Sequence, residues 1–169
     1  IVIPANYYNE YALLLRVMRQ QRVQPKAIYS VLGGAASSYK FLKEFPEIAN
    51  GIIDCNHWFN PKDARVAPLK ARVEEKGAYF SYEVFMTYTA MLLLADALER
   101  AKSADRAAII EALASSTFQD NLMPYGPTKF VNGQNTGAQP LLTQVIGGDI
   151  KVIFPAEYRQ ADAVFPLKA

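Results

Sequence analysis

Short β-type runs alternate with amphipathic helical segments through the first half of the chain, and this alternation limits the fold more than any other feature. The β-type runs lie at residues 1–3, 27–32 and 51–55. Helical segments follow them from about residue 9, at residues 37–45 and at residues 65–76. Because strands that alternate with helices usually build a parallel sheet with helices on its faces, the pattern predicts an α/β fold with a mostly parallel sheet.

Apolar spacing supports two of the helices most strongly. Tyr11, Leu14, Leu15 and Met18 recur at the i, i+3, i+4 and i+7 positions of one helix face. A longer helix is expected at residues 82–102, and its apolar stripe predicts a core element. The stripe consists of Phe85, Tyr88, Met91, Leu92, Ala95 and Leu98.

The last third of the chain changes from helical to β-type spacing. A short helix that contains Ile109, Ile110 and Leu113 comes first, with Ser103 or Asp105 as its expected N-cap. Short β-type runs then occupy residues 128–131, 141–146 and 150–154. The glycines at positions 147 and 148 separate the last two runs, which predicts a tight hairpin turn and an antiparallel addition to the sheet.

Charge and hydropathy exclude two classes of partner. The chain has 18 basic and 16 acidic residues and a formal net charge of +2, without a polybasic block, so we expect no nucleic-acid partner. Its longest apolar run, residues 87–95, is shorter than the roughly 20 residues of a membrane-spanning helix.

The first residues contain neither an initiator methionine nor a basic leader, so we expect the chain to be a fragment of a longer protein.

Catalytic and metal-binding patterns are missing from the sequence. His57 is the only histidine, and a structural or ligand-contacting role is favoured for it over a lone general base. Gly33 and Gly34 follow a strand but lack the rest of a phosphate-binding motif. Cys55 is the only cysteine and is expected to be a small buried residue. We therefore expect no catalytic residues, no metal and no cofactor.

Aromatic side chains gather near the expected strand ends and helix starts. They are Tyr7, Tyr8, Trp58, Phe59, Tyr82 and Phe85. Open α/β sheets bind ligands at the carboxyl ends of their strands, so this group predicts an apolar pocket with polar tips. Packing in the core is the alternative for each of these residues, and the sequence leaves it open.

The order of segments resembles the later part of the type I periplasmic binding proteins of the branched-chain amino acid uptake class. The segment at residues 5–16, followed by residues 25–28, is similar to the start of that later part. The long apolar helix opened by Ser81 and Tyr82, and the sequence Tyr125-Gly126-Pro127-Thr128-Lys129-Phe130, resemble their usual closing part. The resemblance covers nearly the whole chain.

This resemblance implies two Rossmann-like α/β lobes joined by three crossovers, of which only the C-terminal part is present. Residues 1–78 would belong to the second lobe, the helix pair at 79–123 to the first, and residues 124–169 to the second again. The implied function is the extracytoplasmic, periplasmic substrate-binding component of an ABC importer, with permease subunits as partners. The missing N-terminal part, or another copy, would cover the helix pair. A ligand-sensing input domain of the same fold is the alternative.

The same resemblance predicts the ligand site. Tyr7 or Tyr8 and Trp58 would face the ligand from the second lobe, and Tyr82 or Phe85 from the first. In amino-acid-binding members an acidic residue after the second strand usually pairs with the ligand's ammonium group, and Leu32 or a neighbour occupies that position here. The implied ligand is a small aromatic or aliphatic carboxylate without an α-amine, unless Asp54 or Glu83 supplies the counter-charge.

Overall fold

The computed structural model describes residues 1–31, 35–124 and 126–167, and it divides into two compact units. Unit 1 comprises Ile1–Tyr82 and Pro140–Ala169, and unit 2 comprises Glu83–Gln139. Unit 2 was expected from the sequence at residues 79–123. It begins four residues later, at Glu83, and extends further along the chain, to Gln139. The assignment of the units to two lobes stays a prediction.

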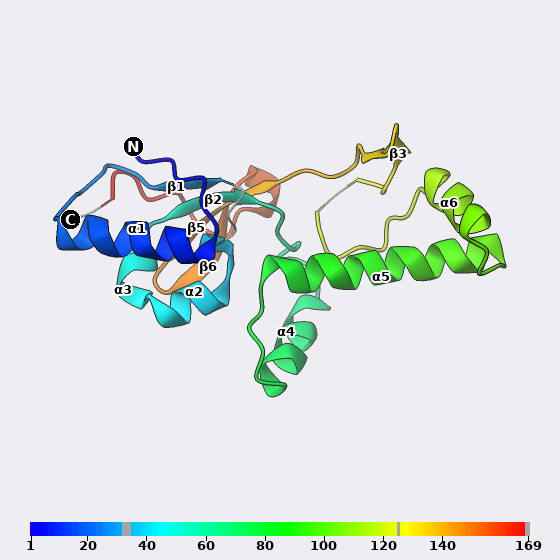
Figure 1. Ribbon diagram of the computed structural model, residues 1–169, viewed down its shortest axis with the longest axis horizontal. Helices are drawn as coiled ribbons and strands as arrows, with labels where there is room; N and C mark the ends of the chain where they lie inside the picture. The colour runs from blue at the N-terminus through cyan, green and yellow to red at the C-terminus, as the bar shows by residue number, and fades with distance from the viewer. Residues whose placement is uncertain (32–34, 125, 168–169) are drawn as a thin grey trace. The chain divides into compact units, whose positions relative to one another are not determined.

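A four-stranded sheet forms the centre of unit 1 (Figure 1). In spatial order its strands are β1 (Tyr29–Val31), β2 (Ile53–Asn56), β5 (Leu141–Ile146) and β6 (Asp149–Phe154). The first two strands are parallel, and β2–β5 and β5–β6 are antiparallel. An isolated parallel bridge joins Val2 to Ile28. The expectation of a mostly parallel sheet is therefore wrong, because the late hairpin enters the sheet directly beside β2 and makes it mixed.

The turn between β5 and β6 follows the sequence prediction. Gly147 and Gly148 have φ angles of 61° and 78°, and Ile146 pairs with Asp149 across the turn. Consecutive residues with positive φ belong to the two-residue turns whose twist matches that of paired strands, and glycine adopts such angles without steric cost. This turn lets β6 fold back along β5.

Helices α1 (Tyr8–Gln20), α2 (Tyr39–Glu44), α3 (Pro46–Ala49) and α4 (Val66–Glu75) complete unit 1, with short 3-10 turns η1 (Ala35–Ser37) and η2 (Ala156–Tyr158). In Figure 1, α1, α2 and α3 lie together beside the strands. Tyr11 of α1 meets Phe41 of α2 edge-on, at 5.6 Å between ring centres, and both side chains are fully buried. The apolar stripe predicted for α1 thus packs into the core.

A buried glutamine of β5 connects the residues just before β2 to the last described segment of the chain. Gln144 Nε2 donates to the carbonyl oxygens of Gly51 and Val164, at 2.9 Å each, and Gln144 Oε1 accepts from the Val164 N–H. All the hydrogen-bonding groups of this amide are therefore used, which removes most of the cost of burying it.

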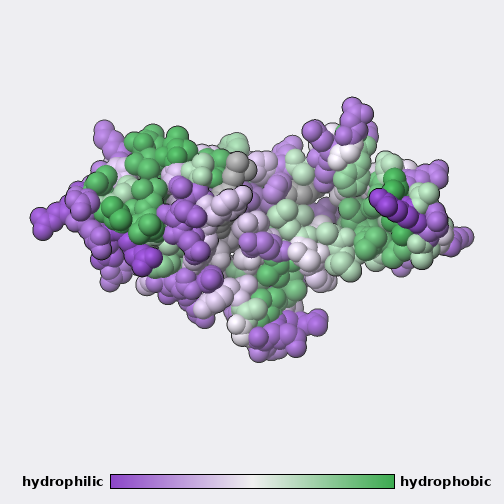
Figure 2. All heavy atoms as spheres, in the orientation of Figure 1, coloured by the Kyte–Doolittle hydropathy of each residue, from purple (hydrophilic) through white to green (hydrophobic). Residues whose placement is uncertain are grey.

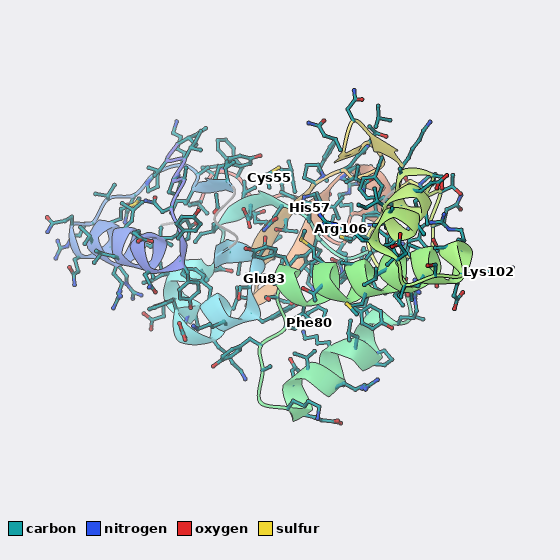
Figure 3. The ribbon with its side chains drawn as sticks, turned by 45° about the vertical axis from the view of Figure 1, so that its right-hand side comes forward. Cys55, His57, Phe80, Glu83, Lys102 and Arg106 are labelled. Atoms are coloured by element: carbon teal, nitrogen blue, oxygen red, sulfur yellow. The ribbon has the colours of Figure 1, made fainter. Side chains whose placement is uncertain are left out.

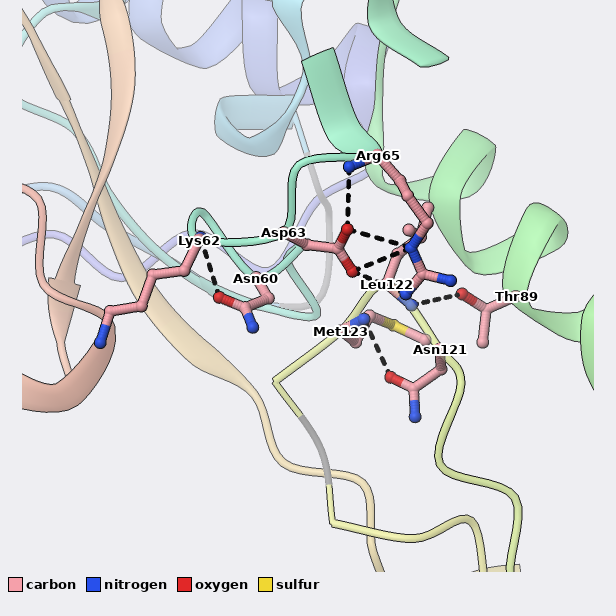
Figure 4. A network of polar contacts seen from close by, with 8 residues as sticks. All are labelled: Asn60, Lys62, Asp63, Arg65, Thr89, Asn121, Leu122 and Met123. Carbon is pink, nitrogen blue, oxygen red and sulfur yellow. Dashed lines mark hydrogen bonds and ion pairs between the residues drawn. The ribbon is translucent and has the colours of Figure 1, made fainter. Parts of the chain in front are cut away.

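Helix α5 (Tyr82–Ala101) belongs to unit 2 except for its first residue, Tyr82, which is counted in unit 1. Unit 2 also contains α6 (Arg106–Ala114) and a hairpin of β3 (Phe130–Val131) and β4 (Gln134–Asn135). Asp105 is the N-cap of α6, and its carboxylate accepts from the N–H groups of Ala107 and Ala108. Thr89 Oγ1 accepts from the Leu122 N–H at 3.4 Å and attaches the following loop to α5 (Figure 4). The predicted helix pair is confirmed.

The apolar stripe expected on the long helix is only partly buried. Phe85 is buried, whereas Met91 is 60% exposed and Tyr88, Leu98 and the α6 residue Ile110 are also exposed. Figure 2 shows hydrophobic surface over α5 and α6. Among the described residues, no helix has both the length and the hydrophobicity for a membrane crossing.

Candidate functional site

The carboxyl ends of β1 and β2 lie side by side, because the two strands are parallel and in register. Beyond β1 the chain reaches η1, and beyond β2 it enters the segment at residues 57–61. Ligands of open α/β sheets bind at such an edge, where strand ends and the following loops supply side chains. This edge of unit 1 is therefore the candidate site.

A row of buried polar side chains crosses the sheet just behind this edge. Ser30 of β1 pairs in register with Asp54 of β2, and Asp54 pairs with Thr143 of β5. Register partners share a sheet face, so the three side chains form one row. Each is at most 1% exposed. Ser37 at the end of η1 adds a third hydroxyl, which donates a hydrogen bond to Asp54 Oδ2.

Burial dominates the protonation of Asp54. It raises the pKa of this carboxyl group to about 6, although hydrogen bonds from Ser37 and Ser30 and from the Cys55 N–H act in the opposite direction. Burial also raises the pKa of the Tyr11 phenol on α1. Ser30 is close enough to influence both groups, yet Asp54 Oδ1, Ser30 Oγ and Tyr11 OH lack a well-formed hydrogen bond within the described part of the chain. Asp54 is thus a carboxylate that titrates near neutral pH.

The residues at the end of β2 offer neutral polar groups. His57 is half-buried, and burial lowers its pKa, so its imidazole is uncharged at pH 7. Asn56 Oδ1 accepts from the His57 N–H at 2.8 Å. Cys55 is half-buried, whereas full burial was expected from the sequence. Figure 3 labels Cys55 and His57. The described residues contain no cluster of His, Cys, Asp and Glu able to hold a metal ion.

Side-chain hydrogen bonds shape the loop from β2 to α4 (Figure 4). Asn60 Oδ1 accepts from the Lys62 N–H at 2.9 Å, and Asp63 Oδ1 accepts from the Arg65 N–H at 2.9 Å. The Arg65 guanidinium also contacts the Asp63 carboxylate at 2.7 Å, and these bonds lower the pKa of Asp63. The charge of Asp63 is therefore already compensated within the loop.

The predicted ligand residue Trp58 lies in a group of packed rings. Its ring centre is 4.9 Å from that of Phe59 and 6.4 Å from that of Tyr39, and Phe80 is 5.7 Å from Phe59. Trp58 and Phe80 are fully buried and Phe59 is 8% exposed. We call these four residues the aromatic group. Trp58 is therefore a core residue of unit 1, whereas a ligand contact at Trp58 stays a prediction.

Tyr7 and Tyr8 differ sharply in their surroundings. Tyr7 precedes α1 and is 83% exposed. Tyr8 begins α1 and is held by α2: its hydroxyl donates to Glu44, and its ring packs on Phe41 and under the Lys40 ammonium. The sequence left both tyrosines open as ligand contacts, and Tyr7 is the one whose ring is accessible to solvent.

The other predicted site residues stay untested. Leu32 lies outside the described residues. Tyr82 begins α5 and is half-buried, and Phe85 follows it in unit 2 and is buried. Their predicted role, to close a cleft from the first lobe, remains a prediction.

Sequence reasoning missed Tyr39 and the hydroxyl members of the polar row, and it named Asp54 only as an alternative counter-charge. The Tyr39 hydroxyl donates to Asp149 Oδ1 at 2.7 Å, and the Lys70 ammonium lies 3.6 Å from its ring centre. A single aspartate inside the apolar run at residues 51–55 was the available signal for the row. Serines at positions 30 and 37 carry no comparable signal, because serine is common in loops and at strand ends.

Comparison with known proteins gives one family match. The family described as periplasmic binding protein matches residues 1–149. A search of curated proteins returned no match.

Solved structures share the fold at low sequence identity. A leucine binding protein from Thermotoga maritima has a TM-score of 0.71 and 21% identity, over 89% of this chain and 42% of its own. A protein described as a branched-chain amino acid ABC transporter, from Silicibacter pomeroyi, has a TM-score of 0.67 and 18% identity, over 95% and 45%. An extracellular ligand-binding receptor from Rhodopseudomonas palustris has a TM-score of 0.63 and 21% identity, over 82% and 43%. The chain thus spans less than half the length of these proteins.

Proposed function

Because the chain belongs to the periplasmic binding protein family, we propose that it is part of the extracytoplasmic substrate-binding component of an ABC importer. In this function the protein captures a small molecule and passes it to permease subunits, and it catalyses no reaction. The observation that carries the proposal is the family match over residues 1–149, in which the parallel strands β1 and β2 present a ligand edge. The relatives are solute-binding proteins, a class without catalytic activity.

The polar groups at this edge support ligand capture over catalysis. The half-buried His57 is neutral, and Asn56 next to it carries an amide. Asp63 is compensated by Arg65, and Asp54 is fully buried behind the edge. Neutral hydrogen-bonding groups beside aromatic side chains suit recognition of a small organic molecule.

For the ligand we propose an aromatic or aliphatic carboxylate without an α-amine. The sequence from Ser30 to Gly34 contains no acidic residue. Asp54, one of the two alternative counter-charges, is 0% exposed and bound to Ser37. An ammonium group that loses its hydration without a counter-charge binds poorly. Glu83 in unit 2 remains the alternative counter-charge, and an amino acid, as in the names of the relatives, is the second candidate ligand.

Calorimetry on the full-length protein tests this ligand class. Phenylalanine is paired with 3-phenylpropanoate, and leucine with 4-methylpentanoate, so that each pair differs only in the α-amine. We expect the deaminated member to bind at least about tenfold more tightly, because its desolvation is cheaper.

The Glu83→Gln variant is the matched control. It should leave the affinity for 3-phenylpropanoate unchanged. Tighter binding of the amino acids, abolished by Glu83→Gln, would assign the counter-charge to Glu83 and overturn the proposed ligand class. Binding of neither pair would contradict the capture of hydrophobic carboxylates altogether.

A sensory input domain of the same fold is the competing function, because fold alone does not determine function. One solved relative is itself described as an extracellular ligand-binding receptor. Neighbouring permease genes and an export signal would support transport, and a fused output domain would support sensing.

We also propose that an N-terminal part of the same protein, or another copy, covers the helix pair of unit 2. The relatives are more than twice as long as the region they share with this chain. Met91, Leu98 and Ile110 leave apolar surface on α5 and α6, and contiguous surface of this kind usually marks an interface.

Expressed alone, this chain should therefore self-associate, and the added N-terminal part should return it to a single species. Analytical ultracentrifugation measures both states. A monodisperse monomer with one cooperative thermal transition, from this chain alone, would contradict the covering partner.

A further inference from the structure

We propose that Asp54 is a positioning residue of the ligand edge: its carboxylate holds η1 in place through Ser37, and loss of its charge weakens ligand capture. The inference rests on the proposed function, and it adds proton-dependent regulation to that site. Neither Asp54 nor Ser37 needs to touch the ligand.

The geometry links Asp54 to η1, a buried segment that also packs against α1, α2 and β5. Asp54 lies in the middle of β2, and its Oδ2 accepts from Ser37 Oγ, the last residue of η1. Asp54 and Ser37 are both 0% exposed, so water cannot replace this bond. A hydrogen bond to an ionised acceptor is roughly twice as strong as one to a neutral acceptor. The charge on Asp54 therefore contributes to how firmly η1 is held against β2 and β5.

The second carboxylate oxygen is where a proton would bind. Asp54 Oδ1 is buried and has no well-formed hydrogen bond within the described residues, so a proton there leaves the bond from Ser37 to Oδ2 in place but weakens it. The new O–H group could donate to Ser30 Oγ or Tyr11 OH, which are buried in the same row and equally lack a well-formed partner. Protonation of Asp54 would therefore weaken the hydrogen bond from Ser37 of η1 and add a hydrogen bond to Ser30 or Tyr11.

The neighbours of Asp54 do not obscure its titration. Ser30, Ser37 and Thr143 are hydroxyl side chains on β1, η1 and β5. The nearby titratable groups are Tyr11 on α1, Tyr29 on β1 and Cys55 on β2. Phenols ordinarily titrate well above pH 7.5, and burial raises the pKa of both Tyr11 and Tyr29 further. Burial raises the pKa of Asp54 to about 6, so this carboxyl group changes charge between pH 5.5 and 7.5.

The first test needs no ligand. Carbon-13 NMR of the aspartate carboxyl groups in the full-length protein should show Asp54 titrating with a midpoint near 6. The Ser37→Ala variant should raise this midpoint, because Ser37 stabilises the charged form. An unchanged midpoint in Ser37→Ala would show that the hydroxyl does not anchor the carboxylate, and would overturn the inference.

The second test measures ligand affinity at pH 5.5 and 7.5 by calorimetry. The probe is 3-phenylpropanoate, or phenylalanine if the amine proves the tighter ligand. In the unmodified protein the affinity should fall about threefold at the lower pH, because roughly a quarter of Asp54 is still charged there when its pKa is about 6. Asp54→Asn should bind with the same affinity at both values, and no more tightly than the unmodified protein does at pH 5.5.

Asp162→Asn is the matched control, since Asp162 is an exposed aspartate of unit 1 outside the ligand edge. It should keep the pH dependence of the unmodified protein. Equal pH dependence in the unmodified protein and in Asp54→Asn would overturn the inference while leaving the proposed function intact. Absence of binding by either probe would contradict the proposed function, and the NMR titration would still decide whether Ser37 anchors Asp54.

Discussion

Replacing Trp58 with alanine is expected to lower the free energy of unfolding by about 3–5 kcal/mol, the cost usual for removing a buried aromatic ring. Trp58 is 0% exposed and packs against Tyr39 and Phe59. Removal would leave a cavity inside the aromatic group, which close-packed surroundings refill only in part. Thermal and denaturant unfolding followed by circular dichroism measure the change, because Trp58 is the only tryptophan and its fluorescence is lost.

Tyr7→Ala is the matched control, as it removes another predicted ligand-contacting aromatic that is 83% exposed. Its unfolding free energy should change by no more than about 0.5 kcal/mol. If Tyr7 contacts the ligand, this variant should instead lose affinity. A Trp58→Ala protein that keeps its stability and loses only affinity would refute the packing role and favour a direct ligand contact.

Asp54→Asn is expected to stabilise the protein at pH 7.5 by up to about 3 kcal/mol, although it should weaken ligand binding. The carboxyl group has its pKa raised from 3.8 to about 6 by burial. Each pKa unit corresponds to about 1.36 kcal/mol. Asparagine has nearly the same shape and removes the charge that burial penalises. Stability that rises as affinity falls is the signature of a strained functional group.

The pH dependence of stability gives the sign of this effect. The folded state binds the Asp54 proton more tightly than the unfolded chain does, since its folded pKa is the higher one. The resulting stabilisation is complete below about pH 4 and is lost as the pH rises to about 6. The stability difference between Asp54→Asn and the unmodified protein should therefore grow over this range. A constant difference from pH 4 to pH 7 would show that Asp54 has no raised pKa.

Short-range patterns were enough to predict most of the elements. The spacing of Tyr11, Leu15 and Met18 predicted α1, because a helix face repeats every 3.6 residues and this face is buried. Gly147 and Gly148 predicted the β5–β6 turn, because few other residues accept positive φ at both positions. The α/β class and the family resemblance followed from the order of these elements, and the family match agrees with them.

Pairings between distant residues were decided only by the tertiary structure. The hairpin at residues 141–154 could lie at either edge of the sheet, and its position beside β2 makes the sheet mixed. Ser30, Asp54 and Thr143 become neighbours only through strand register, which no local pattern encodes. Gln144 reaches Gly51 over 93 residues of sequence in the same way.

Burial is the second property that the sequence left open. Tyr7, Tyr8 and Trp58 looked alike as aromatic residues near expected strand ends or a helix start, yet one is exposed, one is held by α2 and one is fully buried. An aromatic ring can either pack in a core or recognise a ligand, and its chemistry is the same in both cases. The sequence therefore determined which elements form and which residues stand at their ends, whereas long-range packing decided how far each side chain is removed from solvent, and with it the raised pKa of Asp54.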